Sequence, residues 1–351
     1  MTKSKIDSGE YSFGLDSFGD LATGKDGKLL SYAESIRLVV DEAVLADKLG
    51  VDVIALGEHH REEYAISSPD MVLSAIASKT KRIKLASGVT VLSSDDPVRV
   101  FERFSTLDAV SNGRAQVILG RGSFTESFPL FGYDLKDYEE LFEEKIELFN
   151  KLLKEQPVTW EGKLTQSLDN ADVFPKTESG KLETYVGVGG SPQSVVRAAA
   201  YGFPLVLAII GGSPERFAPY VELYRRASKE FGHEAHPVGM HSPGFIADTD
   251  EEAVKVAFPL FKEAMDKVGK TRGWQPMSRE HFLNEVKNGS MYVGSPETVA
   301  NKIAKAMKAV DAKRFDMVYG FGPMKAEARR HMIELYATKV ISRVRELLAE
   351  K

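Results

Sequence analysis

The feature of this sequence that most constrains its fold is an alternation of short apolar runs with longer stretches of helical period. Eight short runs rich in β-branched residues are the expected strands: Ser12–Asp16, Val53–Leu56, Ile83–Val91, Ala115–Leu119, Thr184–Val188, Leu205–Ile210, Val238–Ala247 and Phe315–Tyr319. The expected helices are Tyr32–Leu49, Pro97–Val110, Tyr138–Lys154, Pro192–Tyr201, Pro214–Phe231, Glu251–Val268, Pro296–Val310 and Ala326–Leu348. Strands that alternate with helices form a parallel sheet, and eight such units predict a (β/α)8 TIM barrel.

An open doubly wound sheet is the alternative fold, because it uses the same alternation. That fold usually carries a Gly-rich turn after its first strand, whereas residues 16–20 read Asp-Ser-Phe-Gly-Asp. We therefore predict one barrel domain over residues 1–351, with an insertion at 155–181 and a candidate lid loop at 269–292. Connections of this length in a compact domain are usually functional or carry small elements of their own.

The composition of the chain narrows the function classes. Its net charge of −5 gives no basic footprint for nucleic acid or for a membrane surface. It has no cysteine, which excludes disulfides, zinc–thiolate sites and cysteine nucleophiles. Residues 1–10 lack the apolar segment of a secretory signal, and no stretch reaches the roughly 18 apolar residues of a membrane helix. We expect a soluble cytoplasmic protein that binds neither nucleic acid nor a membrane.

Small and polar residues follow four of the expected strands. The active site of a TIM barrel lies at the carboxyl ends of its strands, so these segments are the candidate site. They are Gly57-Glu58-His59-His60-Arg61, Ser87-Gly88, Gly120-Arg121-Gly122-Ser123-Phe124 and Gly187-Val188-Gly189-Gly190-Ser191.

The segment Glu58-His59-His60 offers two imidazoles and a carboxylate. A metal site is disfavoured, because adjacent histidines point in different directions and no third ligand with helical spacing is evident. General acid–base catalysis by at least one of His59 and His60 fits the pKa range of histidine. The alternative is that both histidines form structural hydrogen bonds at the top of the barrel.

The tripeptide Gly-Ser-Pro occurs three times, at Gly190–Pro192, Gly212–Pro214 and Gly294–Pro296. In each copy the serine can cap a helix and the proline can be its first residue. Glu215 and Glu297 follow the second and third copies, and a carboxylate in the first turn satisfies the positive end of a helix.

The first copy differs because Gln193 and Ser194 follow it, with no acid. Its helix start is left open for an external anion, with free N–H groups, hydroxyls and preceding glycines. Arg121 lies at the neighbouring strand end and can pair with the same phosphate. The pattern therefore predicts a phosphate site, and the alternative is three plain caps.

These segments resemble the luciferase-like flavin monooxygenase family. The matching segments fall in the family's order: Leu56-Gly57-Glu58-His59-His60, Leu85-Ala86-Ser87-Gly88-Val89, Asp96-Pro97-Val98-Arg99, Leu107-Asp108-Ala109-Val110-Ser111-Asn112-Gly113-Arg114, Gly120-Arg121-Gly122 and Val186-Gly187-Val188-Gly189-Gly190-Ser191. The resemblance covers roughly the first half of the chain, and the remainder agrees mainly in architecture.

The resemblance implies a barrel that binds FMN or reduced FMN and uses O₂ to oxidise a small organic substrate. It implies that Arg121, Ser191 and Ser194 hold the FMN phosphate and that a non-prolyl cis peptide lies under the flavin ring at Gly88–Val89. The cofactor-binding residues so implied are Ser87, Gly88, Val89, Arg121, Gly122, Gly189, Gly190, Ser191 and Ser194. The family has an acidic residue just before the phosphate-binding serine, where this chain has Gly190.

His59 resembles the histidine that supports flavin chemistry by proton transfer, with Glu58 and His60 beside it as catalytic candidates and no metal. The resemblance also implies a homodimer, and reduced FMN supplied from NAD(P)H by a separate reductase. Two alternatives stay open: a deazaflavin-dependent hydride transfer on the same barrel, and a flavin-binding barrel without catalysis. Light emission and a particular substrate are not implied.

Overall fold

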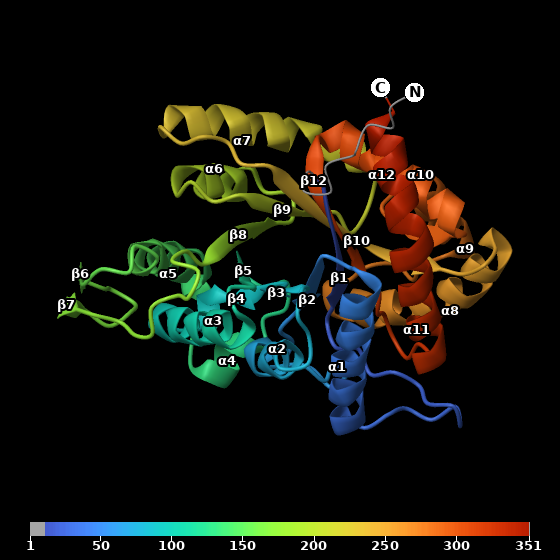
Figure 1. Ribbon diagram of the computed structural model, residues 1–351, viewed down its shortest axis with the longest axis horizontal. Helices are drawn as coiled ribbons and strands as arrows, with labels where there is room; N and C mark the ends of the chain where they lie inside the picture. The colour runs from blue at the N-terminus through green and yellow to red at the C-terminus, as the bar shows by residue number, and fades with distance from the viewer. Residues whose placement is uncertain (1–10, 351) are drawn as a thin grey trace.

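The protein forms a closed parallel barrel (Figure 1) in a computed structural model that describes residues 11–350, apart from the side chains at 271 and 272. The eight barrel strands are β1 (Ser12–Ser17), β2 (Val53–Leu56), β3 (Lys84–Ser87), β5 (Ala115–Gly120), β8 (Glu183–Val188), β9 (Leu205–Ala208), β10 (Val238–Ile246) and β12 (Ala312–Val318). They pair in that order, and β12 closes the ring on β1. The predicted (β/α)8 barrel is confirmed.

Helices surround the barrel in the expected positions. They are α1 (Tyr32–Leu49), α3 (Pro97–Ser111), α5 (Tyr138–Leu152), α6 (Pro192–Ala200), α7 (Ala218–Glu230), α8 (Asp250–Arg272), α10 (Pro296–Val310), α11 (Ala326–Leu335) and α12 (Ile341–Ala349). Three helices were not predicted: α2 (Pro69–Ala77), α4 (Ser127–Phe131) and α9 (Arg279–Asn288). The closing helix is interrupted by a π-helical turn at Tyr336–Val340, which joins α11 to α12.

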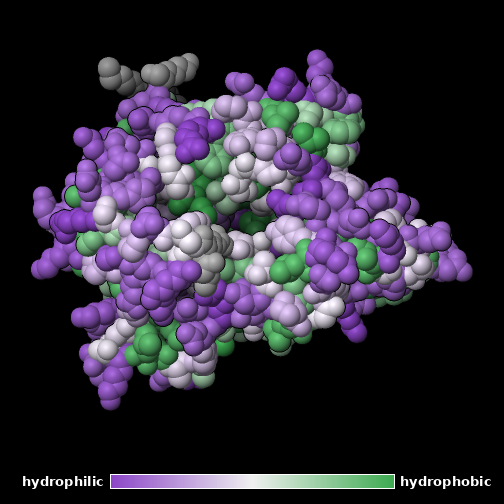
Figure 2. Space-filling model, turned by 180° about the vertical axis from the view of Figure 1, so that it is seen from behind, coloured by the Kyte–Doolittle hydropathy of each residue, from purple (hydrophilic) through white to green (hydrophobic). Residues whose placement is uncertain are grey.

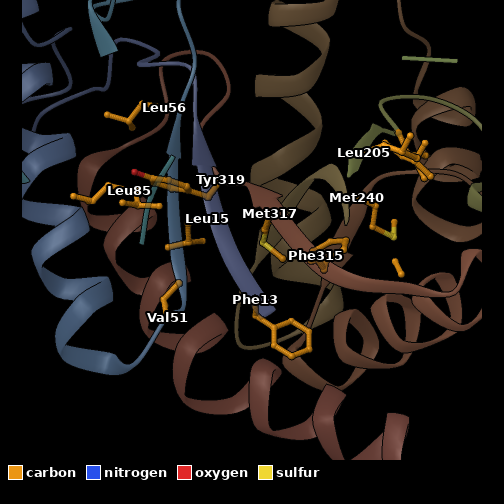
Figure 3. Close-up of a cluster of buried hydrophobic side chains, with 14 of the residues drawn as sticks. Phe13, Leu15, Val51, Leu56, Leu85, Leu205, Met240, Phe315, Met317 and Tyr319 are labelled. Carbon is orange, nitrogen blue, oxygen red and sulfur yellow. The ribbon is translucent and has the colours of Figure 1, made fainter. Parts of the chain in front are cut away.

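The main hydrophobic core lies between the outer face of the barrel and the helices (Figure 3). Side chains alternate along a strand, so Phe13 and Leu15 of β1 point outward beside Phe315 and Met317 of β12. These side chains are at most 1% exposed. Burying a side chain of this size contributes about 1.5–3 kcal/mol, so the outer layer stabilises the barrel that holds the site.

The inside of the barrel is more polar than this outer layer. Val53, Ala55 and Ala86 form a separate small apolar cluster there. Gly14 is required beside Asp316, because a Cβ at position 14 would lie 2.2 Å from the Asp316 Oδ1.

A chain of polar side chains crosses the lumen below this cluster. The Arg314 Nε donates to Asp316 at 2.8 Å, and its Nη1 donates to the Gln116 Oε1 at 3.0 Å. Gln116 donates in turn to Glu183, which also pairs with Lys84. Arg314 and Gln116 are buried, so side chains fill the lumen at this level.

The third strand differs from its prediction. The expected strand Ile83–Val91 is broken into β3 and β4 (Thr90–Val91), and the Gly88–Val89 peptide between them is cis. The Val89 side chain lies over two glycines of neighbouring strands. A Cβ at Gly120 would come within 2.5 Å of it, and a Cβ at Gly187 within 3.0 Å. The two glycines therefore leave the space that the Val89 side chain occupies.

The insertion at 155–181 contains an antiparallel hairpin of β6 (Val158–Trp160) and β7 (Leu168–Ala171). It projects from the barrel at the left of Figure 1, next to α5. Polar side chains cover most of the opposite view of the molecule, where hydrophobic residues gather around a hollow near the centre (Figure 2). No helix in residues 11–350 is long and apolar enough to cross a membrane.

The candidate lid at 269–292 is mostly helical, which corrects the expectation of a loop. It contains the end of α8, all of α9 and the first residue of β11 (Tyr292–Gly294), which pairs with β10. Phe282 of α9 is fully buried against Phe258 and Phe261 of α8. The Glu285 Oε2 accepts a 3.0 Å hydrogen bond from the Gly212 N–H after β9. The end of α9 is therefore anchored, and a lid role for this segment stays a prediction.

Candidate functional site

His59 lies just after β2 in a box of three aromatic rings. Its ring centroid is 5.0 Å from that of Phe18, 4.4 Å from Tyr64 and 5.1 Å from Phe124. The His59 N–H donates to the Ile66 carbonyl at 3.0 Å, which fixes the backbone of the turn. The box brings together segments that follow β1, β2 and β5 at the carboxyl edge of the barrel.

The chemistry of His59 is set by this enclosure. Its Nε2 is buried and has no hydrogen-bond partner among residues 11–350. Burial, with smaller effects from the charges of His60 and Arg61, lowers the pKa of His59 to about 3. Its imidazole is therefore neutral near pH 7, and Nε2 is a buried polar atom without a partner.

Glu58 and His60 form a pair that is separate from His59. The His60 Nε2 lies 2.9 Å from the Glu58 Oε1, and the Glu58 Oε2 accepts from the Val91 N–H at 3.2 Å. The His60 ring packs edge-on against Phe131, and Glu58 lines a cavity of about 250 Å³ with Phe131. The structure therefore divides the three predicted catalytic residues between two environments.

The start of α6 carries the predicted phosphate-binding residues. The Ser191 side chain caps the helix by accepting from the Ser194 N–H at 3.4 Å. The Arg121 Nη2 donates to the Ser194 hydroxyl at 3.3 Å, so the structure brings Arg121, Ser191 and Ser194 together. A second arginine, Arg197, approaches the same hydroxyl at 3.5 Å.

The charges around this helix start are unusual. The first turn of α6 has no acidic residue. The guanidinium groups of Arg121 and of Arg197, which belongs to the last turn of α6, lie near Ser194 instead, although the start of a helix is already positive. Their partners are Glu139 and Glu143 of α5: Arg121 pairs with Glu139, and Arg197 pairs with both carboxylates. Glu139 is 62% exposed, whereas Arg197 is 7% exposed, so the carboxylate is the freer partner.

The glycines of the candidate site leave room beside this helix start. Gly190 has a φ of +112° and Gly122 has a φ of +77°, a region that other residues rarely adopt. A Cβ at Gly189 would meet nothing within 4 Å. The Gly190 carbonyl is held by the Tyr220 hydroxyl at 2.8 Å. The backbone is therefore fixed around an open approach to α6.

Ser87 and the cis peptide form the floor between β3 and β5. The Ser87 hydroxyl accepts from the Ile118 N–H at 3.2 Å and from the Thr90 hydroxyl at 2.8 Å. It is fully buried, so it braces the break in the strand. Contact of Ser87, Gly88 and Val89 with a cofactor stays a prediction.

Sequence reasoning missed four charged residues near the site: Asp16, His241, Arg197 and Glu139. Asp16 and His241 are paired across the lumen at 2.8 Å. The available signal was a charged residue within an otherwise apolar strand. The ion-pair partners of Arg197 lie 54 or more positions away along the chain, and those of Glu139 lie 18 or more positions away. No local pattern identifies them.

The residues present fit a flavin mononucleotide. The arginines and hydroxyls at α6 suit a phosphate, and the open space at Gly189 gives access to it. The unpaired His59 Nε2 supplies a polar contact among aromatic rings. Across residues 11–350, no three His, Cys, Asp or Glu residues lie together in a way that could hold a metal ion.

The fold and these strand-end groups define a (β/α)8 barrel with its polar site at the carboxyl edge. The family model for luciferase-like monooxygenases matches residues 17–312. The chain therefore belongs to the luciferase-like monooxygenase family of enzymes, as its sequence motifs indicated.

Sequence relatives and solved structures agree with this assignment. The alkanal monooxygenase alpha chain of Photorhabdus luminescens is 27% identical over 248 residues, which are 68% of this chain and 65% of that one. The match thus spans slightly less than two thirds of the relative's length. Monooxygenase RslO1 from Streptomyces bottropensis has a TM-score of 0.81 at 22% identity, over 94% of this chain and 99% of that chain.

Two further structures of the same fold have different cofactors in their descriptions. The oxygenating constituent of 3,6-diketocamphane monooxygenase from Pseudomonas putida, in complex with FMN, has a TM-score of 0.74 at 22% identity, over 94% of this chain and 98% of that chain. The coenzyme F420-dependent tetrahydromethanopterin reductase of Methanopyrus kandleri has a TM-score of 0.66 at 22% identity, over 95% of this chain and 99% of that chain. At this identity the two likenesses concern the fold alone.

Proposed function

We propose that this protein is an FMN-dependent monooxygenase that oxidises a small organic substrate with O₂. The observation that carries the proposal is the start of α6, where two arginines meet a helix end with no acid in its first turn. A phosphate dianion would satisfy the helix end and accept hydrogen bonds from the arginines beside it. The family membership supplies the flavin and oxygen part of the proposal.

The residues of the site have distinct roles in this proposal. Arg121, Ser191 and Ser194 hold the phosphate, and Gly189 and Gly190 let it approach the backbone. The cis Gly88–Val89 segment supports the ring, and Gly122 gives the turn that carries Arg121. Bound flavin supplies the two-electron chemistry, while the protein orients it and excludes water with the aromatic box around His59.

The role we propose for His59 is hydrogen bonding, whereas the sequence predicted acid–base catalysis. Because its pKa is lowered to about 3, it is neutral and can accept or donate one hydrogen bond through Nε2. We propose that His59 orients the flavin and that the Glu58–His60 pair shapes the adjoining cavity of about 250 Å³. General acid catalysis by His59 would need the ligand to raise this pKa.

A deazaflavin-dependent oxidoreductase is the second candidate, and the F420-dependent relative of the same fold favours it. Coenzyme F420 carries its phosphate within a longer side chain, whereas FMN ends in a phosphate dianion. The second guanidinium near Ser194, that of Arg197, favours the dianion. A third candidate, a flavin-binding barrel without catalysis, predicts binding with no O₂ consumption.

A binding titration tests the proposal. Purified protein is titrated with FMN, reduced FMN, riboflavin and F420, and binding is followed by flavin fluorescence or absorbance. We expect one form of FMN to bind tightly and riboflavin, which lacks the phosphate, to bind at least about 100-fold more weakly. Tight binding of F420 alone would reject the FMN-dependent function and support the deazaflavin-dependent one. Absence of binding by every form would reject a flavin role.

The remaining parts of the proposal concern partners and location. We propose that a separate NAD(P)H-dependent reductase supplies reduced FMN, that the chain forms a homodimer, and that it acts in the cytoplasm. Segment 269–292 is proposed as the lid, and the end of its helix α9 is anchored by Glu285. The substrate class is a small organic molecule, to be found by a mass-spectrometric screen with reduced FMN.

A further inference from the structure

A second imidazole lies at the top of the barrel, held by a buried carboxylate. The His241 Nδ1 of β10 lies 2.8 Å from the Asp16 Oδ2 of β1. The Asp16 side chain is 2% exposed and that of His241 is 12% exposed. The carboxylate fixes Nδ1 as the hydrogen-bonded nitrogen, so Nε2 is the nitrogen left for exchange with a ligand.

This pair lies beside the proposed flavin floor. A Cβ at Gly88 would lie 3.1 Å from both Asp16 carboxylate oxygens, so the cis Gly88–Val89 segment is directly next to the carboxylate. Phe18 packs edge-on against both histidines, at 6.4 Å from His241 and 5.0 Å from His59. The two imidazoles thus flank one phenyl ring at the carboxyl edge of the barrel.

The two histidines differ in what surrounds them. His59 lies among aromatic rings with its Nε2 unpaired, which keeps the ring neutral. His241 faces Asp16 on β1 and Asp316 on β12, its cross-strand neighbour, while Arg314 pairs with Asp316 one layer below. The neighbour on β9 is Ala208, which carries no charge. His241 therefore has a carboxylate partner, which His59 lacks.

The second carboxylate oxygen of Asp16 takes no part in the contact with His241. Its Oδ1 is buried and has no hydrogen-bond partner among residues 11–350. Burial raises the pKa of the Asp16 carboxyl, although the hydrogen bond and charge of His241 oppose this. Asp16 therefore holds His241 through one carboxylate oxygen while its other oxygen stays unpaired.

We propose that His241, oriented by Asp16, is the proton-transfer residue for the flavin reaction at this site. The inference rests on the proposed function. Bound reduced FMN would supply the electrons for O₂ reduction, and His241 would supply one of the protons that the reduced oxygen takes up. The His241 Nε2–H bond would break with its electron pair left on nitrogen, and solvent would return the proton.

Nuclear magnetic resonance of ¹⁵N-histidine-labelled protein tests the placement without relying on turnover. We expect saturating FMN to shift the His241 Nε2 resonance and Asp16→Asn to change its titration. His331 is the matched control, because its Nε2 pairs with Asp248 at 3.0 Å on the exposed surface. A His241 signal that does not respond in FMN-saturated protein overturns the inference and leaves the proposed function intact. If no flavin binds, both fall.

Stopped-flow oxidation of bound reduced FMN by O₂ tests the proton transfer and needs no substrate. We expect His241→Gln to slow the oxidation about 100-fold and to remove its pH dependence, with FMN affinity changed less than about threefold. Asp16→Asn should shift the pH profile, and His331→Gln should match the unaltered protein. An unchanged rate and pH profile in His241→Gln would refute the assignment. Loss of FMN affinity equal to the loss of rate would show a structural role instead.

Discussion

The starts of α6 and α10 share the tripeptide Gly-Ser-Pro but have opposite surroundings. At α10, Ser295 caps the helix, and Asp250 accepts from the Ser295 N–H at 2.6 Å and from the Thr298 hydroxyl at 2.9 Å. Glu297 adds a further carboxylate in the first turn. At α6 there is no acid in the first turn, and Arg121 approaches the Ser194 hydroxyl.

The difference separates a structural cap from a binding site. Carboxylates at α10 satisfy the positive end of the helix from within the chain, so that start is complete. At α6 the helix end and the arginines carry the same sign, and the nearby Glu139 pairs with the arginine rather than with the helix N–H groups. An external anion is the group that satisfies all of them together.

The largest expected effect comes from removing the arginine at α6. Arg121→Ala should raise the Kd for FMN about 10- to 100-fold, since charge-assisted hydrogen bonds contribute about 1.5–3 kcal/mol. Fluorescence titration measures the change. Arg343→Ala is the control, because Arg343 pairs with Glu297 at the start of α10. Equal effects of the two variants would contradict the comparison.

Making α6 resemble α10 should give the next largest effect. The Gln193 side chain already folds back to the Ser191 hydroxyl at 2.9 Å, so Gln193→Glu places a carboxylate at the helix start. We expect about a tenfold weaker affinity for FMN together with a higher Tm, because the new charge satisfies the helix end but repels the phosphate. The reverse change, Glu297→Gln, should lower the Tm and leave FMN binding unaltered. A variant Gln193→Glu that bound FMN normally would remove the phosphate from this position.

Removing the carboxylate that pairs with Arg121 should give a smaller effect of opposite sign, a higher affinity for FMN. Glu139 pairs with Arg121 and is largely exposed. Glu139→Gln should therefore tighten FMN binding about threefold at low ionic strength, and the gain should fade in 1 M salt because exposed charges are screened. Glu140→Gln, on the same turn and paired with Lys163, is the control. Weaker binding in Glu139→Gln would show that the carboxylate positions Arg121 for the ligand.

The smallest expected effect is a loss of stability at the start of α10 at low pH. Burial raises the pKa of Asp250, but hydrogen bonds from Ser295 and Thr298 outweigh it and hold that pKa below 3.8. A lowered carboxyl pKa gives stability that is present above pH 3.8 and is lost as pH falls through the folded-state value. Hydrogen-exchange protection of the Thr298 amide should therefore drop below about pH 4, more than that of the Ser194 amide. Asp250→Asn should abolish the difference.

Local patterns were sufficient to predict the barrel and part of the site. Each strand prediction rested on a short apolar run, and each fell on a barrel strand. The start of α6 and its pairing with Arg121 were also predicted, because cap chemistry is local and strand ends of a barrel share one edge. Helix α4 was missed because it has only five residues, and α9 because its segment was predicted as a loop.

Contacts between distant strands could not be read from the sequence. Asp16 and His241 are 225 positions apart, and nothing near either residue indicates the other. The predicted catalytic group Glu58-His59-His60 shows the opposite case, in which neighbours in the sequence do not form one group in the structure. Its residues are adjacent in sequence, yet His59 turns into aromatic rings while Glu58 and His60 pair with each other. Side-chain direction is decided by packing, which adjacency does not reveal.

The filled lumen of the barrel has a kinetic consequence. Arg314 hydrogen-bonds to Gln116, which bonds in turn to Glu183, so no passage is open through the middle of the barrel at that level. Every molecule must enter and leave by the carboxyl mouth. If the flavin lies on the floor at Gly88–Val89, it must bind first and depart last, and substrate and product exchange above it. We expect an ordered mechanism, in which oxidised FMN, the last product to leave, inhibits competitively against reduced FMN.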